Sequence, residues 1–289
     1  MTEDLLLINK KDMKNTFSQL NIGRDQKTFI IAEAGINHNG DLETALRLVE
    51  AAKTAGASAI KFQTYVTEKR VTPDNPVFGV LKKCELAGGQ QRKIKEHADR
   101  LGITFFSTPF DLESAEFLRK LGVPLMKIAS FDIVNKQLLA AVAAAGIPTI
   151  ISRGMADAAE IDTAAAIFEK HGTEYALLHC ISAYPTPKTA ANLNVIPALL
   201  EKYSCPIGFS DHTLDIDASI YAAAMGARII EKHFTLDRSQ DGPDHKLSAD
   251  PESLATLCVK ISELETMLGS ADLQAVPEEE GAKIFRRPT

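Results

Sequence analysis

Two histidines near the end of the sequence have the placement of a shared metal site. His212 closes the apolar run PIGFSDH, and His233 closes the next run, RIIEKHF. If these runs are neighbouring parallel strands, which lie about 4.8 Å apart, both imidazoles can reach one ion. Two nitrogen ligands completed by carboxylates, hydroxyls and water suit six-coordinate Mn²⁺ or Mg²⁺ better than a structural zinc ion. A lone histidine is more often a structural residue, so the prediction depends on the pair.

Lysines and serines at equivalent places suggest a pocket for an anion. Lys61 and Lys127 lie in two other apolar runs, and four consecutive runs end in serines, which are Ser130, Ser152, Ser182 and Ser210. Cations and hydroxyls around one centre can bind a carboxylate or a phosphate. Any one serine is more often a turn residue or a helix cap, so the repetition carries the prediction. A serine nucleophile is disfavoured, because the sequence has no GxSxG turn.

Carboxylates also stand at or near the ends of the apolar runs. Glu33 and Asp132 are acid–base groups if burial raises their pKa, and they are ion-pair partners of Lys61 or Lys127 if it does not. The polar segment 237–252, DRSQDGPDHKLSADPE, is either a lid over the site or a solvated loop. His38, in NHNGD, either contacts substrate or caps the following helix.

These residues stand at the ends of eight short apolar runs, each followed by an amphipathic helical stretch. The runs cover residues 29–35, 58–64, 103–109, 125–131, 149–154, 175–180, 206–212 and 228–234. The pattern predicts parallel strands covered by helices, and eight such units favour a single-domain (β/α)₈ TIM barrel, whose active site lies at the carboxyl ends of the strands. A doubly wound sheet is the alternative, but AEAGINHNGD lacks the GxGxxG spacing.

Period-two alternation predicts which side chains point into the barrel. Lys61 with Gln63, Ser210 with His212, and Glu231 with His233 each share one strand face. Lys127 is out of phase with Ser130 and Asp132. A bulge or an early loop is therefore needed if all three face the site.

Composition limits the classes of function. The 289 residues carry a formal net charge of -6, without basic runs or a long apolar stretch. Nucleic-acid binding and membrane spans are disfavoured, and a cytoplasmic protein with small-molecule partners is expected. The four cysteines have no paired spacing, which predicts reduced and mostly buried thiols. Residues 1–28 are expected to close the barrel bottom, 29–270 to form the catalytic barrel, and 271–289 to be a polar tail.

Segments around these residues resemble the N-acetylneuraminate (sialic acid) synthase family, which includes legionaminate, pseudaminate and spore-coat polysaccharide synthases. The similar segments are IIAEAGINHNGD, AGASAIKFQT, FFSTPFD, MKIASFDI, LLHCISAYPTP with NLNVI, IGFSDHT, GARIIEKHFTLDR and GPDHKLSADPE. They cover residues 30 to about 260 in order. Eight spaced segments are a far more specific signal than any single motif.

The resemblance implies a (β/α)₈ enzyme that condenses phosphoenolpyruvate with an N-acylated hexosamine, such as N-acetylmannosamine, to give a nine-carbon 2-keto sugar acid and phosphate. It implies a homodimer and a divalent metal, Mn²⁺ or Mg²⁺, on His212 and His233. It places phosphoenolpyruvate at Lys61, Lys127, Ser130, Ser152, Ser182 and Ser210. Catalytic carboxylates fall on Glu33, Asp132 and Glu231, and the sugar side falls on Gln63, Thr108, Tyr184 and Asp244.

The chain departs from the family pattern in several places. Asp132 stands where many members have Glu, Ala183 replaces a polar residue, and Arg153 stands where Thr is usual. The small C-terminal antifreeze-like domain, which supplies an arginine to the partner's sugar site, is absent from the sequence. Two alternatives remain. One is a synthase for another aldose or aldose phosphate, which a cationic pocket near Arg153 would favour, and the other is a non-catalytic barrel that binds a sugar acid.

Overall fold

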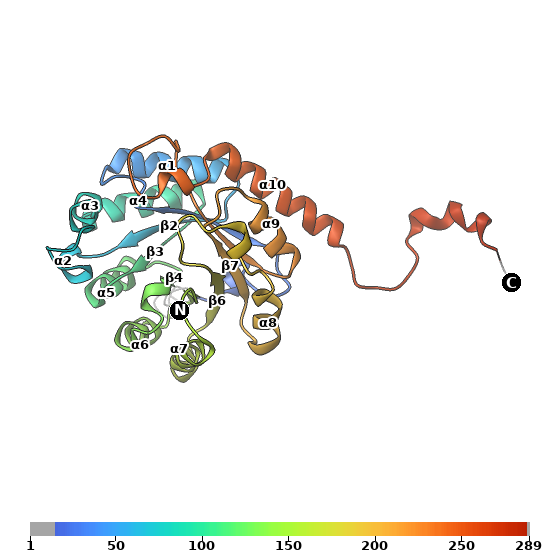
Figure 1. The fold of residues 1–289 in the computed structure, drawn as a ribbon, viewed down its shortest axis with the longest axis horizontal. Helices are drawn as coiled ribbons and strands as arrows, with labels where there is room; N and C mark the ends of the chain where they lie inside the picture. Colours follow the sequence, from blue (N-terminus) through green and yellow to red (C-terminus); the bar gives the residue numbers. More distant parts are fainter. Residues whose placement is uncertain (1–14, 288–289) are drawn as a thin grey trace, which may run out of the picture.

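Eight parallel strands close into a barrel in the computed structural model, which describes residues 15–287. Each strand pairs with its sequence neighbour, and β1 also pairs with β8 (Figure 1). The strands are β1 (Phe29–Gly35), β2 (Ala59–Thr64), β3 (Thr104–Pro109), β4 (Met126–Ile128), β5 (Thr149–Ser152), β6 (Tyr175–Cys180), β7 (Ile207–Asp211) and β8 (Ile229–His233). The predicted barrel is confirmed, and the doubly wound alternative is excluded.

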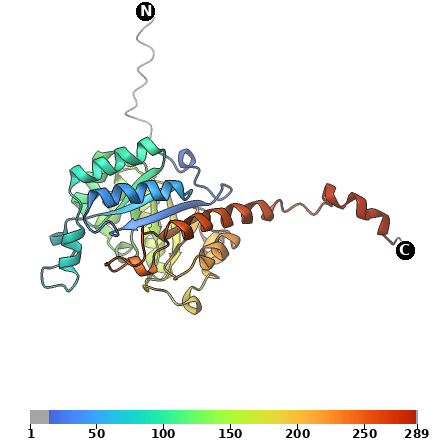
Figure 2. The ribbon, with the colours of Figure 1, turned by 90° about the horizontal axis from the view of Figure 1, so that it is seen from above.

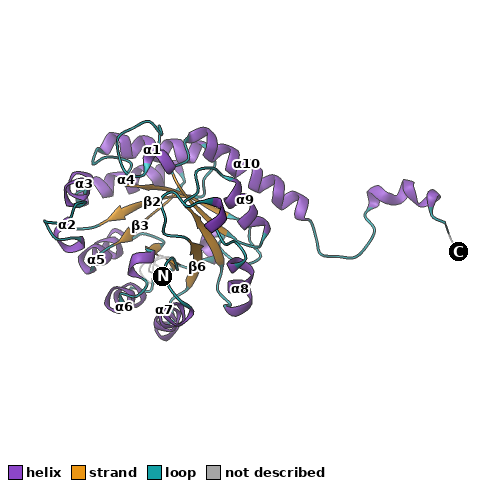
Figure 3. Ribbon diagram, in the orientation of Figure 1, coloured by secondary structure: helices purple, strands orange, loops and turns teal. Residues whose placement is uncertain are grey.

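Helices surround the strands, as Figure 3 shows. They are α1 (Leu42–Thr54), α2 (Thr67–Arg70), α3 (Phe78–Cys84), α4 (Gly88–Leu101), α5 (Leu112–Leu121), α6 (Lys136–Ala144), α7 (Ala158–His171), α8 (Val195–Lys202), α9 (Asp217–Ala224) and α10 (Pro251–Leu268). The Asp41 side chain accepts a hydrogen bond from the Thr44 amide and caps α1. Gly122 ends α5 at a φ of 72°, a conformation that favours glycine. Within the described part of the chain, no helix has the length and apolar character needed to cross a membrane.

The barrel interior has an apolar lower layer and a polar upper layer. The lower layer is a buried cluster of side chains from six strands, joined by Leu125 just before β4, and contains Phe29, Ile31, Ala59, Phe106, Leu125, Ile150, Ala176, Leu178 and Ile229. Phe17 and Ile22, which flank the 3₁₀ turn Ser18–Leu20, pack against this cluster. Gly208 is needed here, because a Cβ would lie 2.3 Å from the Ile229 carbonyl oxygen. The first fourteen residues of the predicted N-terminal extension lie outside the described chain.

The chain beyond α10 leaves the barrel. Residues 269–287, which include the 3₁₀ helix Pro277–Phe285, are exposed. Figures 1 and 2 show this segment extending away from the strands.

The fourth strand is shorter than the apolar run 125–131 suggests. β4 ends at Ile128, and residues Ser130–Asp132 form a 3₁₀ turn. The change from strand to turn explains why Lys127, Ser130 and Asp132 all face the same cavity although they do not alternate. The early loop required by the sequence pattern is therefore present.

Candidate active site

A cavity of about 670 Å³ opens at the carboxyl ends of the strands. Fourteen of the fifteen predicted site residues line it, namely Glu33, Lys61, Gln63, Thr108, Lys127, Ser130, Asp132, Ser152, Tyr184, Ser210, His212, Glu231, His233 and Asp244. They come from every strand or the loop that follows it. Ser182 is the exception.

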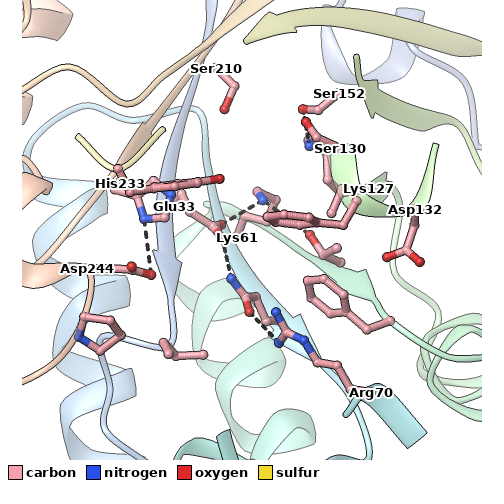
Figure 4. A pocket seen from close by; sticks show the side chains of 18 of the residues that line it. Glu33, Lys61, Arg70, Lys127, Ser130, Asp132, Ser152, Ser210, His233 and Asp244 are labelled. Atoms are coloured by element: carbon pink, nitrogen blue, oxygen red, sulfur yellow. Dashed lines mark hydrogen bonds and ion pairs between the residues drawn. The ribbon is translucent and has the colours of Figure 1, made fainter. Parts of the chain in front are cut away.

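Two buried carboxylates and two buried lysines form an ion-pair network at the base of the cavity (Figure 4). Lys61 Nζ lies 3.0 Å from Glu33 Oε2 and 3.3 Å from Glu231 Oε2. Lys127 Nζ lies 3.9 Å from Glu231 Oε1. Burial makes unpaired charges costly, so each member of this network requires the others.

The two carboxylates differ in their expected protonation. Burial raises the pKa of Glu33 to about 7, against the lowering effect of Lys61, and the nearby Glu231 adds to the rise. Burial alone would also raise the pKa of Glu231, but the charges of Lys127 and Lys61 hold it at about 2. At neutral pH, Glu231 is a fixed anion and Glu33 is poised to gain or lose a proton.

Hydroxyl groups complete the base of the cavity. Lys127 Nζ donates to Ser152 Oγ at 2.5 Å, and Ser210 Oγ donates to Glu231 Oε1 at 3.0 Å. Lys61 Nζ lies 3.3 Å from Thr108 Oγ1. The arrangement offers cations and hydroxyl groups to an anion.

The region around Gly154 accounts for the position of Ser182. A Cβ on Gly154 would lie 2.5 Å from Ser182 Oγ and 2.6 Å from Ser130 Oγ. The Gly154 amide donates to Ser130 Oγ at 3.1 Å, and Cys180 Sγ lies 3.0 Å from the same oxygen. Ser182 Oγ is buried without a hydrogen-bond partner among the described residues. Ser182 Oγ therefore lies in the same group of side chains as Ser130 and Cys180, which line the cavity, although Ser182 is not itself among the lining residues.

The two histidines lie side by side, with ring centroids 5.4 Å apart. His212 Nδ1 lies 2.7 Å from the Ile181 carbonyl oxygen, which can only accept, so Nδ1 carries the proton and Nε2 has a lone pair. Burial lowers the pKa of His212 to about 4 and that of His233 to about 3, and both rings are neutral at pH 7. Neutral imidazoles are the form that binds metals. No cluster of three or more His, Cys, Asp or Glu side chains in residues 15–287 forms a metal site. Substrate or water would therefore supply the remaining ligands.

The outer part of the cavity carries polar groups suited to a polyol. Asp244 Oδ2 lies 3.7 Å from His233 Nδ1, and the Tyr184 ring lies 4.2 Å from the His212 ring, centroid to centroid. Burial raises the pKa of both Asp132 and Asp244. Asp244 belongs to the segment predicted as a lid or a solvated loop, and here it lines the cavity.

Two residues singled out by the sequence point elsewhere. Arg153 Nη1 donates to His179 Nδ1 at 3.2 Å and Nη2 donates to the Ala156 carbonyl, and Arg153 does not line the cavity. The cationic pocket near Arg153 that would favour an aldose phosphate is therefore not formed there. His38 Nδ1 accepts from the Gly40 amide, while Asp41 caps α1.

Sequence reasoning missed Arg70, the last residue of α2, which lines the cavity opposite the serines. Apolar side chains from the segment between β2 and α4 also line the cavity, including Val77, Val80 and Leu81. The feature of the sequence that could have indicated Arg70 is the length of this segment, residues 65–87. It is long for the connection between a barrel strand and its helix.

Comparisons with known proteins find similar chains that cover most of this one. The model of the NeuB family matches residues 48–272. An N,N'-diacetyllegionaminic acid synthase of Legionella pneumophila is 42% identical over 86% of this chain and 76% of its own length. The human N-acetylneuraminate-9-phosphate synthase is 35% identical over 89% of this chain and 75% of its own. The crystal structure of an N-acetylneuraminic acid (sialic acid) synthetase from Leptospira borgpetersenii, in complex with citrate, superposes with a TM-score of 0.87 at 42% identity, covering 90% of this chain and 92% of that one.

Proposed function

The chain belongs to the NeuB family and is a synthase of the sialic-acid type, and we propose that it condenses phosphoenolpyruvate with an N-acylated hexosamine resembling N-acetylmannosamine. The products are a nine-carbon 2-keto sugar acid and phosphate. The observation that carries the proposal is the buried network of Lys61, Lys127 and Glu231 with Ser152 and Ser210 at the base of the cavity.

The network is suited to a substrate that carries two anionic groups. Lys61 and Lys127 present their ammonium groups to the cavity, and Ser152 and Ser210 stand beside them. In a site that excludes water, ion pairs and charge-assisted hydrogen bonds to a carboxylate and a phosphate are strong. Glu231 pairs with both ammonium groups and favours their charged forms.

The proposed reaction moves protons at two places, the aldehyde oxygen and C2. C3 of the enol phosphate attacks the aldehyde carbon, and the aldehyde oxygen gains a proton. Water adds to C2 and loses one proton, and the C2 hydroxyl then gives its remaining proton to the leaving phosphate as the C2–O bond to phosphate breaks and the C2 carbonyl forms. Glu33 is suited to this exchange because its pKa is raised to about 7, and Asp132 is the second candidate because burial raises its pKa as well.

His212 and His233 fit the proposed divalent metal, Mn²⁺ or Mg²⁺, because both rings are neutral and His212 Nε2 has its lone pair free. The bound metal would polarise the aldehyde oxygen. Gln63, Thr108, Tyr184 and Asp244 line the same cavity and would hold the sugar hydroxyl and acyl groups.

The test is phosphate release from phosphoenolpyruvate with Mn²⁺, against N-acetylmannosamine, its 6-phosphate, 2,4-diacetamido hexoses and arabinose 5-phosphate. We expect release that requires an N-acylated sugar and stops with a chelator, with the sugar acid identified by mass spectrometry. The variant Lys127→Met removes one ammonium group from the base of the cavity and should slow this release. Its matched control is Lys95→Met, which removes a surface lysine paired with Asp99. Sugar-independent phosphate release, or turnover only with arabinose 5-phosphate, would contradict the proposal.

A further inference from the structure

Arg70 brings a third cation to the cavity and is held there from two sides. Its guanidinium carbon lies 3.6 Å from the centroid of the Phe110 ring and 4.8 Å from that of Tyr65. Its Nη1 donates to Gln63 Oε1 at 3.0 Å (Figure 4). Stacking and the hydrogen bond together restrict the guanidinium to one position.

The hydrogen bond fixes the orientation of the Gln63 amide. A guanidinium group has only donors, so the amide oxygen must face Arg70. The amide nitrogen then faces Glu33, with Nε2 3.5 Å from Oε1. The opposite orientation would place two N–H groups against each other and an amide oxygen against a carboxylate.

Arg70 and Gln63 thus form the outer end of a row of contacts that reaches the base of the cavity. Gln63 faces Glu33, and Glu33 pairs with Lys61 at 3.0 Å. Gln63 lies on the same strand face as Lys61, two residues farther toward the cavity mouth. The Gln63 amide is therefore the group through which Arg70 can act on both the sugar side and Glu33.

We propose that Arg70 is a positioning residue for the sugar side of the cavity. It holds the Gln63 amide with its N–H groups directed to Glu33 and to the acceptor sugar, and it acts on the acceptor through Gln63. This inference rests on the proposed synthase function. It predicts that loss of Arg70 weakens the use of the sugar and leaves the use of phosphoenolpyruvate unchanged.

The short helix α2 does not depend on Arg70 for its place. The Thr67 amide and hydroxyl both donate to Glu85 Oε2, at 3.0 and 2.6 Å, and Lys69 pairs with Glu113. Replacing Arg70 by methionine keeps an unbranched stem next to Phe110 and removes only the donors and the charge. We therefore expect the variant to fold.

The experiment is a double-mutant cycle of Arg70→Met and Gln63→Met. We expect Arg70→Met to lower kcat/KM for the sugar about tenfold, since a charge-assisted hydrogen bond is lost, with an unchanged KM for phosphoenolpyruvate. In the Gln63→Met background, the same change should alter kcat/KM less than about twofold. Arg70→Lys, which keeps one donor, should recover part of the loss.

Arg92→Met is the matched control, because Arg92 stacks on Phe117 at 5.9 Å and does not line the cavity. If the two single variants each lowered kcat/KM for the sugar and the double variant lowered it by the product of the two factors, the proposal would be overturned. Arg70 would then act on the sugar directly. An equal rise in the KM of phosphoenolpyruvate would overturn it as well.

A measurement without substrate separates this inference from the proposed function. If the wild-type chain shows no turnover with any sugar, the proposed function fails, and the same cycle is run on thermal unfolding. We then expect the double variant to shift the melting midpoint no more than the larger single variant. Additive shifts would show that Arg70 and Gln63 are not coupled and would overturn the inference.

Discussion

The lower and upper layers of the barrel interior are built on the same strands and differ in nearly every physical property. Ile31 and Glu33 share one face of β1, and Ile229 and Glu231 share one face of β8. The first member of each pair is an apolar part of the lower cluster, and the second is a buried carboxylate. The two layers are thus only two residues apart along each strand. Apolar burial stabilises the lower layer, whereas the upper layer must compensate its buried charges with ion pairs.

The comparison teaches that stability and chemistry are separated along the barrel axis. The lower layer has no polar groups to satisfy, so its contribution depends on packing alone. In the upper layer each charge depends on a partner from another strand, as Lys61 depends on Glu33 and Glu231. Changes in the lower layer should therefore alter unfolding, and changes in the upper layer should alter turnover first.

The largest expected effect lies at the two histidines. His212→Ala or His233→Ala should lower metal-dependent turnover more than about a thousandfold, because the metal would supply several kcal/mol of transition-state stabilisation. Circular dichroism should show an intact fold. Activity retained in both variants, or wild-type activity that resists a chelator, would contradict the metal assignment.

Lys127→Met should lower kcat/KM for phosphoenolpyruvate by about a hundredfold to a thousandfold, since it removes a cation that faces the developing charge. It also leaves Glu231 with fewer compensating charges, so the melting midpoint should fall. The measurement is steady-state phosphate release, with Lys95→Met as the control. Comparable activity in the two variants would remove Lys127 from the substrate site.

The lower layer should respond in the opposite way. Phe106→Ala, in a fully buried position, should reduce the free energy of unfolding by about 3–5 kcal/mol and leave kcat unchanged in the folded fraction. Urea unfolding and turnover at low temperature measure the two effects separately. A fall in kcat as large as that of Lys127→Met would show that the two layers are not separable.

The sequence predicted the barrel because apolar runs and helix caps are local signals. The strand ends were predictable for the same reason, since alternation assigns faces as long as a strand continues. Beyond the strand, the turn decides the direction of a side chain, and so Arg153 contacts His179 and the Ala156 carbonyl although it follows strand β5. Arg70 was not predictable, because its position depends on Phe110, which follows β3, as well as on Tyr65 in its own segment.

Asp132→Asn should lower kcat about tenfold and leave binding of phosphoenolpyruvate in place, if Asp132 takes part in proton transfer. Its side chain accepts from Asn135 Nδ2 at 3.2 Å, which an amide in its place can still do. The measurement is kcat together with calorimetric binding of phosphoenolpyruvate. Unchanged kinetics would remove Asp132 from the catalytic residues.

The smallest effect is a dependence of stability on pH that the lower layer cannot produce. The pKa of Glu33 is raised to about 7 from its ordinary value of 4.5, because burial opposes its charge, so the folded chain binds more protons than the unfolded chain between these values. The contribution of Glu33 to stability is therefore present below about pH 4.5 and is lost as the pH rises through about 7. Glu231 acts in the opposite sense, because its pKa is lowered to about 2 and its contribution is lost only as the pH falls toward that value.

Between pH 5 and pH 8 the lowered pKa values of His212 and His233 favour the folded chain as the pH rises, whereas the raised pKa of Glu33 has the opposite effect. Glu33→Gln should therefore make the urea midpoint rise more, or fall less, from pH 5 to pH 8 than it does in the wild-type chain. Phe106→Leu is the control, because a change in the apolar layer should shift the midpoints at both pH values by the same amount. If Glu33→Gln kept the full wild-type difference, the titrating group would lie elsewhere and Glu33 would be ionised throughout this range. The assignment of Glu33 as the residue that exchanges protons at neutral pH would then fail, while the ion-pair network of Lys61 and Glu231 would remain.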